Sequence, residues 1–506
     1  PVVQTGAFRV NALDVSQNSG HITLNQIGNE IAGFSANTTG NVVLNNTGYL
    51  DIKGIRSNGG AISVTSTGNM ENSGAINATA SGSGVNQNGA AISLTSSGAT
   101  LRVRGDITSN GHSSSNNAHQ GGAITLTGQT VELGAVSINS TGTYNAASNG
   151  TGGNAGSLVV DATGAGSSIL LDGTTINLTG GYGQSAYGAG AHLTFNDDVV
   201  LGALSGGATK TVTINAGGGN VAFNGTVNGR DGIGHHLTIG SVRYGTTPSY
   251  GSVGFAAAVG ATETIGNLTL NNVQNVSLGS MQAAGVAINN TTGTTTLNGN
   301  LHTDGANGIH IDSNAISAAG GVGYTTTHGG NVKLATNGSL TLADTSAFNS
   351  SGNIDLTADG GITLSGAQMQ TAGAGIIFRS NTALASDLVI DTTGAGTTAT
   401  GGNVEFHGTL DSSGGPRDLT ITSGTAGDVI FNGTVGQTAQ LDAVSIQSAH
   451  NVSISNSFRA ESVAVNQEGL FSTGSGGGRA RASPVAGNSS GAKKGCDSTS
   501  GVLGSL

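Results

Sequence analysis

Two short pairs near the middle of the chain combine residue types that can hydrolyse a polysaccharide. Asp197-Asp198 is followed by His235-His236 and then by Arg243. Hydrolysis of a glycosidic bond needs one carboxyl group that donates a proton and a second that acts as base or nucleophile. The Asp pair, however, lies inside a strand-like phrase, so we interpret both pairs as solvated residues at strand corners. We predict no catalytic residues, with a polysaccharide hydrolase or lyase as the alternative.

Other ligating and nucleophilic side chains are scattered along the chain. The densest group, His302, Asp304, His310 and Asp312, lacks the spacing that a metal site requires. The single cysteine, Cys496, excludes a disulfide within the chain. We therefore expect no metal, no cofactor and no enzymatic activity.

Tyrosines in irregular segments are the second kind of candidate. Tyr144, Tyr182 and Tyr187 fall in Gly-, Ser- and Asn-rich insertions, and Tyr244 and Tyr250 lie in a further irregular stretch. An exposed Tyr can stack on a sugar ring and donate a hydrogen bond. We predict these five as binding residues, against the simpler interpretation that they are incidental members of solvated loops. The insertions that we expect to project as loops are residues 105–121, 137–156, 180–191 and 318–330, the last of which contains Tyr324.

A repeated phrase must position these residues. It consists of Gly, a small or polar residue, a β-branched residue, a free position and a large apolar residue, as in 40–44 and 402–406. Apolar residues two apart share one face of a strand. The position between them holds Val43 in one copy and Glu405 in another, so we predict that it faces water. The leading Gly and Asn supply either a positive φ or a tight corner.

Adjacent copies of the phrase are 20 to 25 residues apart. This spacing predicts an all-β fold, a right-handed parallel β-helix of about 20 short coils stacked at the inter-strand distance, with irregular loop insertions. A string of β-sandwiches would need longer strands and larger core residues. We assign residues 1–472 to the β-helix and expect the Gly/Ser-rich tail, residues 473–506, to be disordered.

The composition excludes several classes of protein. Charged residues make up 8 % of the chain and aromatic residues 4 %, whereas 89 of 506 residues are Gly. The net charge of −11 is spread thinly, so we expect no nucleic-acid partner, which requires a clustered basic face. No apolar run approaches the length of a membrane span. Ice binding is a remote alternative, because the Thr runs at 294–296 and 325–327 belong to coils of unequal length.

The phrases of the form Gly-Asn-Val-x-Phe-x-Gly-Thr-Val, with the strings at 193–199 and 265–270, resemble repeats of the filamentous-haemagglutinin-like adhesins and large exoproteins of Gram-negative bacteria. The resemblance covers about residues 1–470. It implies a secreted or cell-surface protein, displayed outside the outer membrane after export through an outer-membrane partner. It also implies attachment, through a long repetitive rod, to glycans or proteins of host or neighbouring cells. The Asn-Pro-Asn motif of such secretion domains does not occur, so we expect an interior segment.

Overall fold

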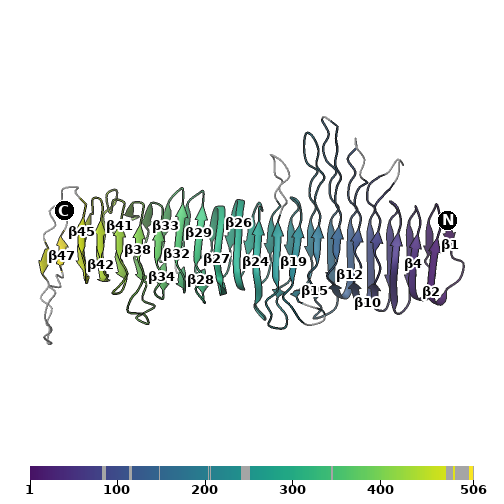
Figure 1. The fold of residues 1–506 in the computed structure, drawn as a ribbon, viewed down its shortest axis with the longest axis horizontal. Helices are drawn as coiled ribbons and strands as arrows, with labels where there is room; N and C mark the ends of the chain where they lie inside the picture. Colours follow the sequence, from purple (N-terminus) through teal and green to yellow (C-terminus); the bar gives the residue numbers. More distant parts are fainter. Residues whose placement is uncertain are drawn as a thin grey trace. The chain divides into compact units, whose positions relative to one another are not determined.

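The computed structural model confirms the predicted all-β solenoid. Successive coils stack through parallel strand pairs and enclose an apolar interior, which is the arrangement of a parallel β-helix. Contacts divide the chain into unit 1, Pro1–Gly279, and unit 2, Ser280–Leu506 (Figure 1). The structure describes residues 1–81, 87–112, 117–147, 149–202, 204, 207–240, 251–343, 346–474, 482–484 and 501–504. These residues include no helix, and so no helix that could span a membrane.

In unit 1 the strands form three parallel ladders, one for each side of the coil. Strand β14 pairs with β17, β15 with β18 and β16 with β19. The first side holds β1 (Val2–Val3), β3 (Ile22–Leu24), β5 (Val42–Asn46), β7 (Ile62–Ser66), β14 (Leu158–Ala162), β17 (Leu193–Phe195), β20 (Val221–Phe223), β23 (Val253–Phe255) and β25 (Val276–Leu278). The second side holds β8 (Met70–Asn72), β15 (Ile169–Leu171), β18 (Val199–Leu201) and β21 (Val227–Asn228). The third side holds β9 (Ile76–Asn77), β11 (Ile107–Thr108), β13 (Ser137–Asn139), β16 (Thr175–Asn177), β19 (Thr211–Asn215), β22 (His236–Gly240) and β24 (Ile265–Asn271). The longer strands are β2 (Arg9–Ser16), β4 (Glu30–Asn37), β6 (Leu50–Arg56), β10 (Ile92–Val103) and β12 (Ile124–Leu133), the last two of which continue from the first side to the second.

Unit 2 has the same three-sided plan. It begins with two long strands, β26 (Met281–Leu297) and β27 (Leu301–Ala318), and β27 pairs with strands on all three sides. The first side holds β29 (Val332–Thr336), β32 (Ile354–Ala358), β35 (Ile376–Phe378), β38 (Val404–Phe406), β41 (Val429–Phe431), β43 (Val452–Ile454) and β45 (Phe471–Thr473). The second side holds β30 (Leu340–Leu342), β33 (Ile362–Leu364), β36 (Thr382–Leu384) and β39 (Leu410–Ser412). The third side holds β28 (Gly323–Thr326), β31 (Ala347–Ser350), β34 (Gln368–Thr371), β37 (Leu388–Asp391), β40 (Leu419–Thr422), β42 (Leu441–Ser448) and β44 (Ala460–Val465).

Most of the predicted tail lies outside the described residues. Two short strands are described there, β46 (Ala482–Pro484) and β47 (Gly501–Gly504). They pair antiparallel with each other, and β47 pairs antiparallel with β44.

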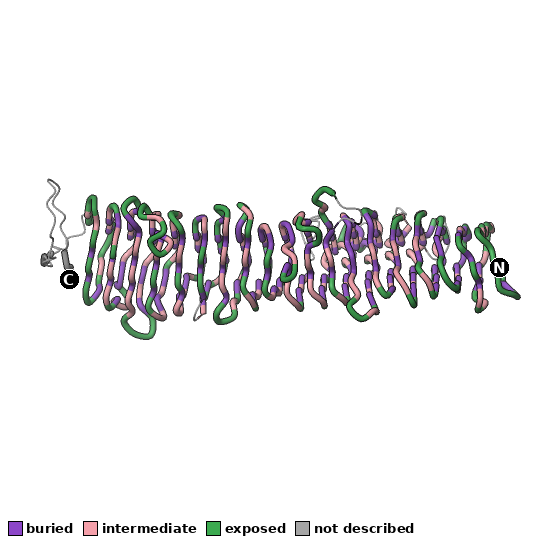
Figure 2. Tube along the Cα trace, turned by 90° about the horizontal axis from the view of Figure 1, so that it is seen from below, coloured by how far each residue is buried: buried purple, intermediate pink, exposed green. Residues whose placement is uncertain are grey.

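The interior of each unit follows the alternation in the sequence. Val221 and Phe223 are buried, whereas Ala222 between them is only partly covered. Figure 2 shows buried residues alternating with partly covered ones along the strands, and exposed residues gathered mainly at the corners and loops. Because the strands pair in register, identical residues of neighbouring coils stack, as Phe223 does on Phe255 with ring centroids 4.8 Å apart.

The leading Gly of the phrase is required by close approach between coils. A Cβ atom on Gly219 would lie 1.9 Å from the carbonyl oxygen of Ala191 in the preceding coil. Gly219 is not among the residues with positive φ. Of the two roles that the sequence allows for this Gly, the structure therefore selects the tight corner, where only a hydrogen atom fits.

The residue after that Gly joins neighbouring coils through its side chain. The Asn41 Oδ1 atom accepts a hydrogen bond from the backbone N–H of Ala61 in the next coil, at 3.0 Å. Asn331 does the same for Asn353, at 2.8 Å. We call these groups corner acceptors. In each case the acceptor belongs to the earlier coil and the donor to the later one.

A row of buried hydroxyl groups lies just before many of the same corners. Ser140 donates to the carbonyl of Gly122 at 2.7 Å, and Ser423 donates to that of Gly402 at 2.7 Å. These hydroxyls satisfy corner carbonyls that the β-ladders leave unpaired. The central residues of the two Thr runs, Thr295 and Thr326, are also buried, so they do not contribute to an outer row of hydroxyls.

Candidate functional site

Two insertion loops of unit 1 lie side by side. One connects β13 to β14 and the other connects β16 to β17 in the next coil. Isolated parallel bridges join Asn145 to Gly183 and Thr151 to Ala186. The N–H of Asn145 also donates to the carbonyl oxygen of Tyr182 at 2.8 Å. The coil stacking therefore continues outward into the two loops.

Glycine allows the two loops to approach so closely. A Cβ atom on Gly152 would lie 1.8 Å from the oxygen of Gly181, and one on Gly181 would lie 1.9 Å from the oxygen of Thr143. Asn145 closes its own loop, because its Nδ2 atom donates to the carbonyl of Thr151 at 3.1 Å. The Gly and Asn content of the insertions thus fixes their relative position.

The paired loops bring three of the predicted tyrosines together. The rings of Tyr144 and Tyr182 stack with centroids 5.3 Å apart and planes 6° apart. Tyr187 meets Tyr182 edge to face, at 5.2 Å and 64°. Tyr144 is 41 % exposed and Tyr182 is 42 % exposed. We call these three residues the tyrosine platform.

The stacking decides which surfaces of the platform a ligand can reach. Tyr144 and Tyr182 each cover one ring face of the other, so an approaching group meets only the parts of these side chains that the stacking leaves exposed. Gln184 adds a carboxamide beside them, with its Nε2 atom 3.3 Å from the hydroxyl of Tyr144. Burial, followed by the neighbouring Tyr182, raises the pKa of Tyr187 above its ordinary value. The platform offers apolar ring surface together with hydrogen-bonding groups.

The remaining tyrosine predictions have different outcomes. Tyr244 and Tyr250 lie outside the described residues. The interpretation of residues 318–330 as a projecting loop is wrong around Tyr324, which lies in β28 with no exposed surface and stacks on Phe348 at 4.4 Å. Register explains the error: Tyr324 pairs with Leu301 and Phe348, and therefore occupies an interior position.

The two pairs considered for hydrolysis, Asp197-Asp198 and His235-His236, lie on different sides of the coil. Asp198 lies between β17 and β18 and accepts the N–H and hydroxyl of Thr226 in the next coil, at 2.7 and 2.9 Å. His235 precedes β22 on the third side and is buried. Its Nδ1 atom accepts the N–H of Lys210, and its Nε2 atom contacts Asp231, both at 3.0 Å. In this arrangement these side chains contact neighbouring coils.

The other member of each pair also binds a backbone N–H of another coil. Asp197 accepts the N–H of Ala162 at 2.8 Å, and His236 accepts the N–H of Asn267 at 2.8 Å. Arg243 lies outside the described residues. Within the described part of the chain, no three His, Cys, Asp or Glu side chains gather as a metal site would require.

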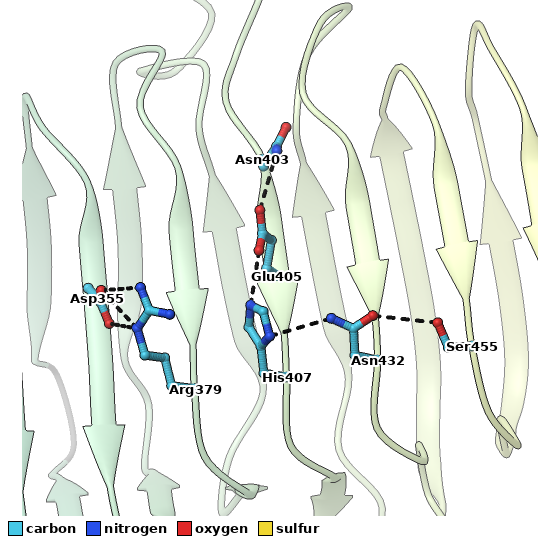
Figure 3. Close-up of polar contacts among 7 residues, drawn as sticks. All are labelled: Asp355, Arg379, Asn403, Glu405, His407, Asn432 and Ser455. Atoms are coloured by element: carbon cyan, nitrogen blue, oxygen red, sulfur yellow. Dashed lines mark hydrogen bonds and ion pairs between the residues drawn. The ribbon is translucent and has the colours of Figure 1, made fainter.

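Unit 2 carries a row of interacting polar side chains on the outside of its first side (Figure 3). Arg379 binds Asp355 through two nitrogens, with contacts of 2.8 and 2.7 Å. In the next coils, Glu405 contacts the Nε2 atom of His407 at 3.0 Å, and Asn432 lies 3.5 Å from its Nδ1 atom. Both ring nitrogens of His407 are therefore engaged within the row. We call these five residues the polar row.

Sequence reasoning missed both Gln184 and the polar row. Apart from Glu405 and His407, which are two residues apart, the members of each contact lie on different coils, such as Gln184 and Tyr144, which are 40 residues apart. Only the register of stacking shows that they meet, and insertions of unequal length hide that register in the sequence.

Comparison with known proteins gives no relative from which a role could be carried over. No protein-family model, curated protein or solved structure matches the chain significantly. The function is therefore argued from the geometry of the described residues.

Proposed function

We propose that this chain is a segment of a secreted, surface-exposed adhesin or exoprotein that attaches to glycans or proteins on host or neighbouring cells. The parallel β-helix supports this proposal, because each coil adds length and outer surface while needing only its neighbours for stability. The resemblance of the repeats to filamentous-haemagglutinin-like adhesins of Gram-negative bacteria supports export through an outer-membrane partner and display outside the outer membrane.

The observation that carries the proposal is the tyrosine platform. Stacking holds Tyr144 and Tyr182 in place, so binding a ligand costs little side-chain entropy. Aromatic side chains exposed on paired loops of a rigid scaffold are typical of attachment surfaces. Many weak contacts of this kind along one molecule would increase avidity without a deep pocket.

The test is binding of the whole chain to immobilised glycoproteins, measured by surface plasmon resonance before and after the glycans are removed enzymatically. We expect Tyr182→Ala to weaken binding about tenfold, because it removes the central ring of the platform. Arg379→Ala, which alters the exposed polar row of unit 2, is the matched control and should bind like the unaltered chain. Equal binding by the Tyr182→Ala variant, or no binding by the unaltered chain, would contradict the proposal.

A second assay separates attachment from polysaccharide hydrolysis. The purified chain is incubated with plant and bacterial polysaccharides, and released reducing ends are measured. We expect no release. Release that disappears in the Asp198→Ala variant would replace the attachment proposal with a catalytic one.

A further inference from the structure

Unit 1 contains a shallow groove, distinct from the tyrosine platform, on the outside of its first coils. Its volume is about 630 Å³, and its lining comes from three neighbouring segments: Arg9 and Val10 of β2, Glu30 and Ala32 of β4, and Gly48 with Tyr49 at the corner before β6. Small-molecule sites commonly have volumes of this order.

An aromatic ring and an ion pair provide the main functional groups of the groove. Tyr49 is 52 % exposed. The Nη2 atom of Arg9 lies 3.3 Å from Oε1 of Glu30, and both side chains are more than half exposed. Arg9 has further N–H donors, and Glu30 has a second carboxylate oxygen, which remain available to a ligand beside the ring.

The backbone around Tyr49 is fixed by the coil corner. Gly48 has a φ of 84°, a conformation that favours glycine, and its N–H donates to Thr67 Oγ1 at 3.1 Å. The carbonyl of Tyr49 accepts a hydrogen bond from Asn46 Nδ2 at 3.3 Å. The ring is therefore presented by an ordered turn.

The charges of the groove favour a ligand without net charge. Arg9 and Glu30 neutralise each other, so an anion would compete with Glu30 and a cation would compete with Arg9. Burial, followed by the carboxylates of Asp51 and Glu71, raises the pKa of Tyr49, while the cations of Lys53 and Arg102 oppose the shift. Charges of both signs therefore surround the ring, so its surroundings favour neither an anion nor a cation.

We propose that this groove binds a neutral pyranose, with the apolar face of the sugar on the ring of Tyr49 and vicinal hydroxyls on the Arg9–Glu30 pair. The ring supplies apolar contact, while the ion pair supplies donors and acceptors side by side. The site does not depend on the tyrosine platform, which is built from residues 144–187.

The test uses the whole chain and saturation-transfer NMR at millimolar sugar. The neutral probes are the methyl glycosides of glucose, galactose and mannose; the charged probes are methyl glucuronide and glucosamine. We expect saturation of at least one neutral glycoside and weaker saturation of both charged sugars. Tyr49→Ala should weaken affinity for the neutral glycoside about threefold to tenfold, whereas Tyr49→Phe should keep most of it. Equal saturation of neutral and charged probes, or none at all, would overturn the proposal.

Further variants distinguish this groove from other sites. Arg379→Ala, in the polar row of unit 2, should leave the neutral-sugar signal intact. Tyr49→Ala should weaken the neutral-sugar signal by the same factor when it is made in the Tyr182→Ala background. Complete loss of the signal in Tyr182→Ala, with retention in Tyr49→Ala, would place the sugar on the platform and overturn the groove. Glu30→Gln releases Arg9 and should increase saturation of methyl glucuronide. No increase would contradict the charge argument. Circular dichroism and thermal unfolding should be unchanged in Tyr49→Ala, because the side chain is exposed.

Discussion

Units 1 and 2 share one kind of interior but differ at their corners. Residues 140–157 connect β13 to β14 in unit 1, whereas residues 351–353 make the corresponding connection from β31 to β32 in unit 2. The long loops of unit 1 extend beyond the strands in Figure 1. Inside, both units stack phenylalanines: Phe195 on Phe223 at 5.0 Å, and Phe378 on Phe406 at 4.6 Å.

This difference shows that the corners can vary without disturbing the core. An insertion adds residues between two strands, but the strands that follow still pair in register with the preceding coil. Unit 1 uses this freedom to build the tyrosine platform. Unit 2 has one long corner of the same kind, residues 392–403 between β37 and β38, and carries the polar row on its first side. Outer features are thus added to a constant interior.

The largest expected effect tests the shared interior. Val221→Asp in unit 1 and Val404→Asp in unit 2 each place a charge at a site that is at most 2 % exposed. Without a partner, such a charge should destabilise its unit by about 3–5 kcal/mol. Denaturant unfolding followed by circular dichroism would measure the loss. If only one of the units were affected, the two interiors would not be equivalent.

An intermediate effect tests the close corners. Gly219→Ala places a Cβ atom 1.9 Å from a backbone oxygen, so the coil must shift, and we expect a loss of about 1–3 kcal/mol. Gly254→Ala is the matched control, because a Cβ there would meet nothing within 4 Å and its φ is not positive. The control should be neutral or slightly stabilising. Similar unfolding midpoints for both variants would refute the close-approach explanation of the repeated Gly.

The smallest effect is confined to unit 2. Burial, followed by the charge of Lys333, lowers the pKa of His310, while Asp312 opposes the shift. Between that lowered pKa and the ordinary His value of about 6.5, the unfolded chain binds more protons than the folded chain. Stability should therefore fall as the pH decreases through about 6.5.

Thermal unfolding between pH 5 and pH 7 would measure this effect. His310→Gln should reduce the pH dependence of the midpoint, and Lys333→Gln should reduce it less, because burial is the larger cause. An unchanged pH dependence in His310→Gln would show that His310 does not contribute.

The repeat was sufficient to predict the fold, because alternation and corner residues report the local environment of each strand. The outward position of Glu405 and the inward positions on either side of it follow directly from the phrase. The sequence marked Tyr144, Tyr182 and Tyr187 as candidate binding residues, but it did not predict that their rings contact one another. Lateral neighbours depend on how many residues each coil contains, and that number changes from the 20 between Val42 and Ile62 to the 34 between Ile124 and Leu158.

The same limitation explains the residues that were misplaced or overlooked. Tyr324 was assigned to a loop because Gly surrounds it, although pairing with Phe348 places it inside. The groove combines Arg9, Glu30 and Tyr49 from three segments, so no local pattern marks it.

The corner acceptors give the stack a direction. Asn41, Asn331 and Asn403 each offer a side-chain oxygen to an N–H of the following coil. Each of these coils therefore presents side-chain acceptors toward the following coil, which presents the matching backbone donors. At these corners the two faces of a coil are therefore not interchangeable, because one face carries side-chain acceptors and the other carries backbone donors. A coil placed in the reverse orientation would set donor against donor and acceptor against acceptor at these corners, so the same bonds that join the coils also specify their polarity.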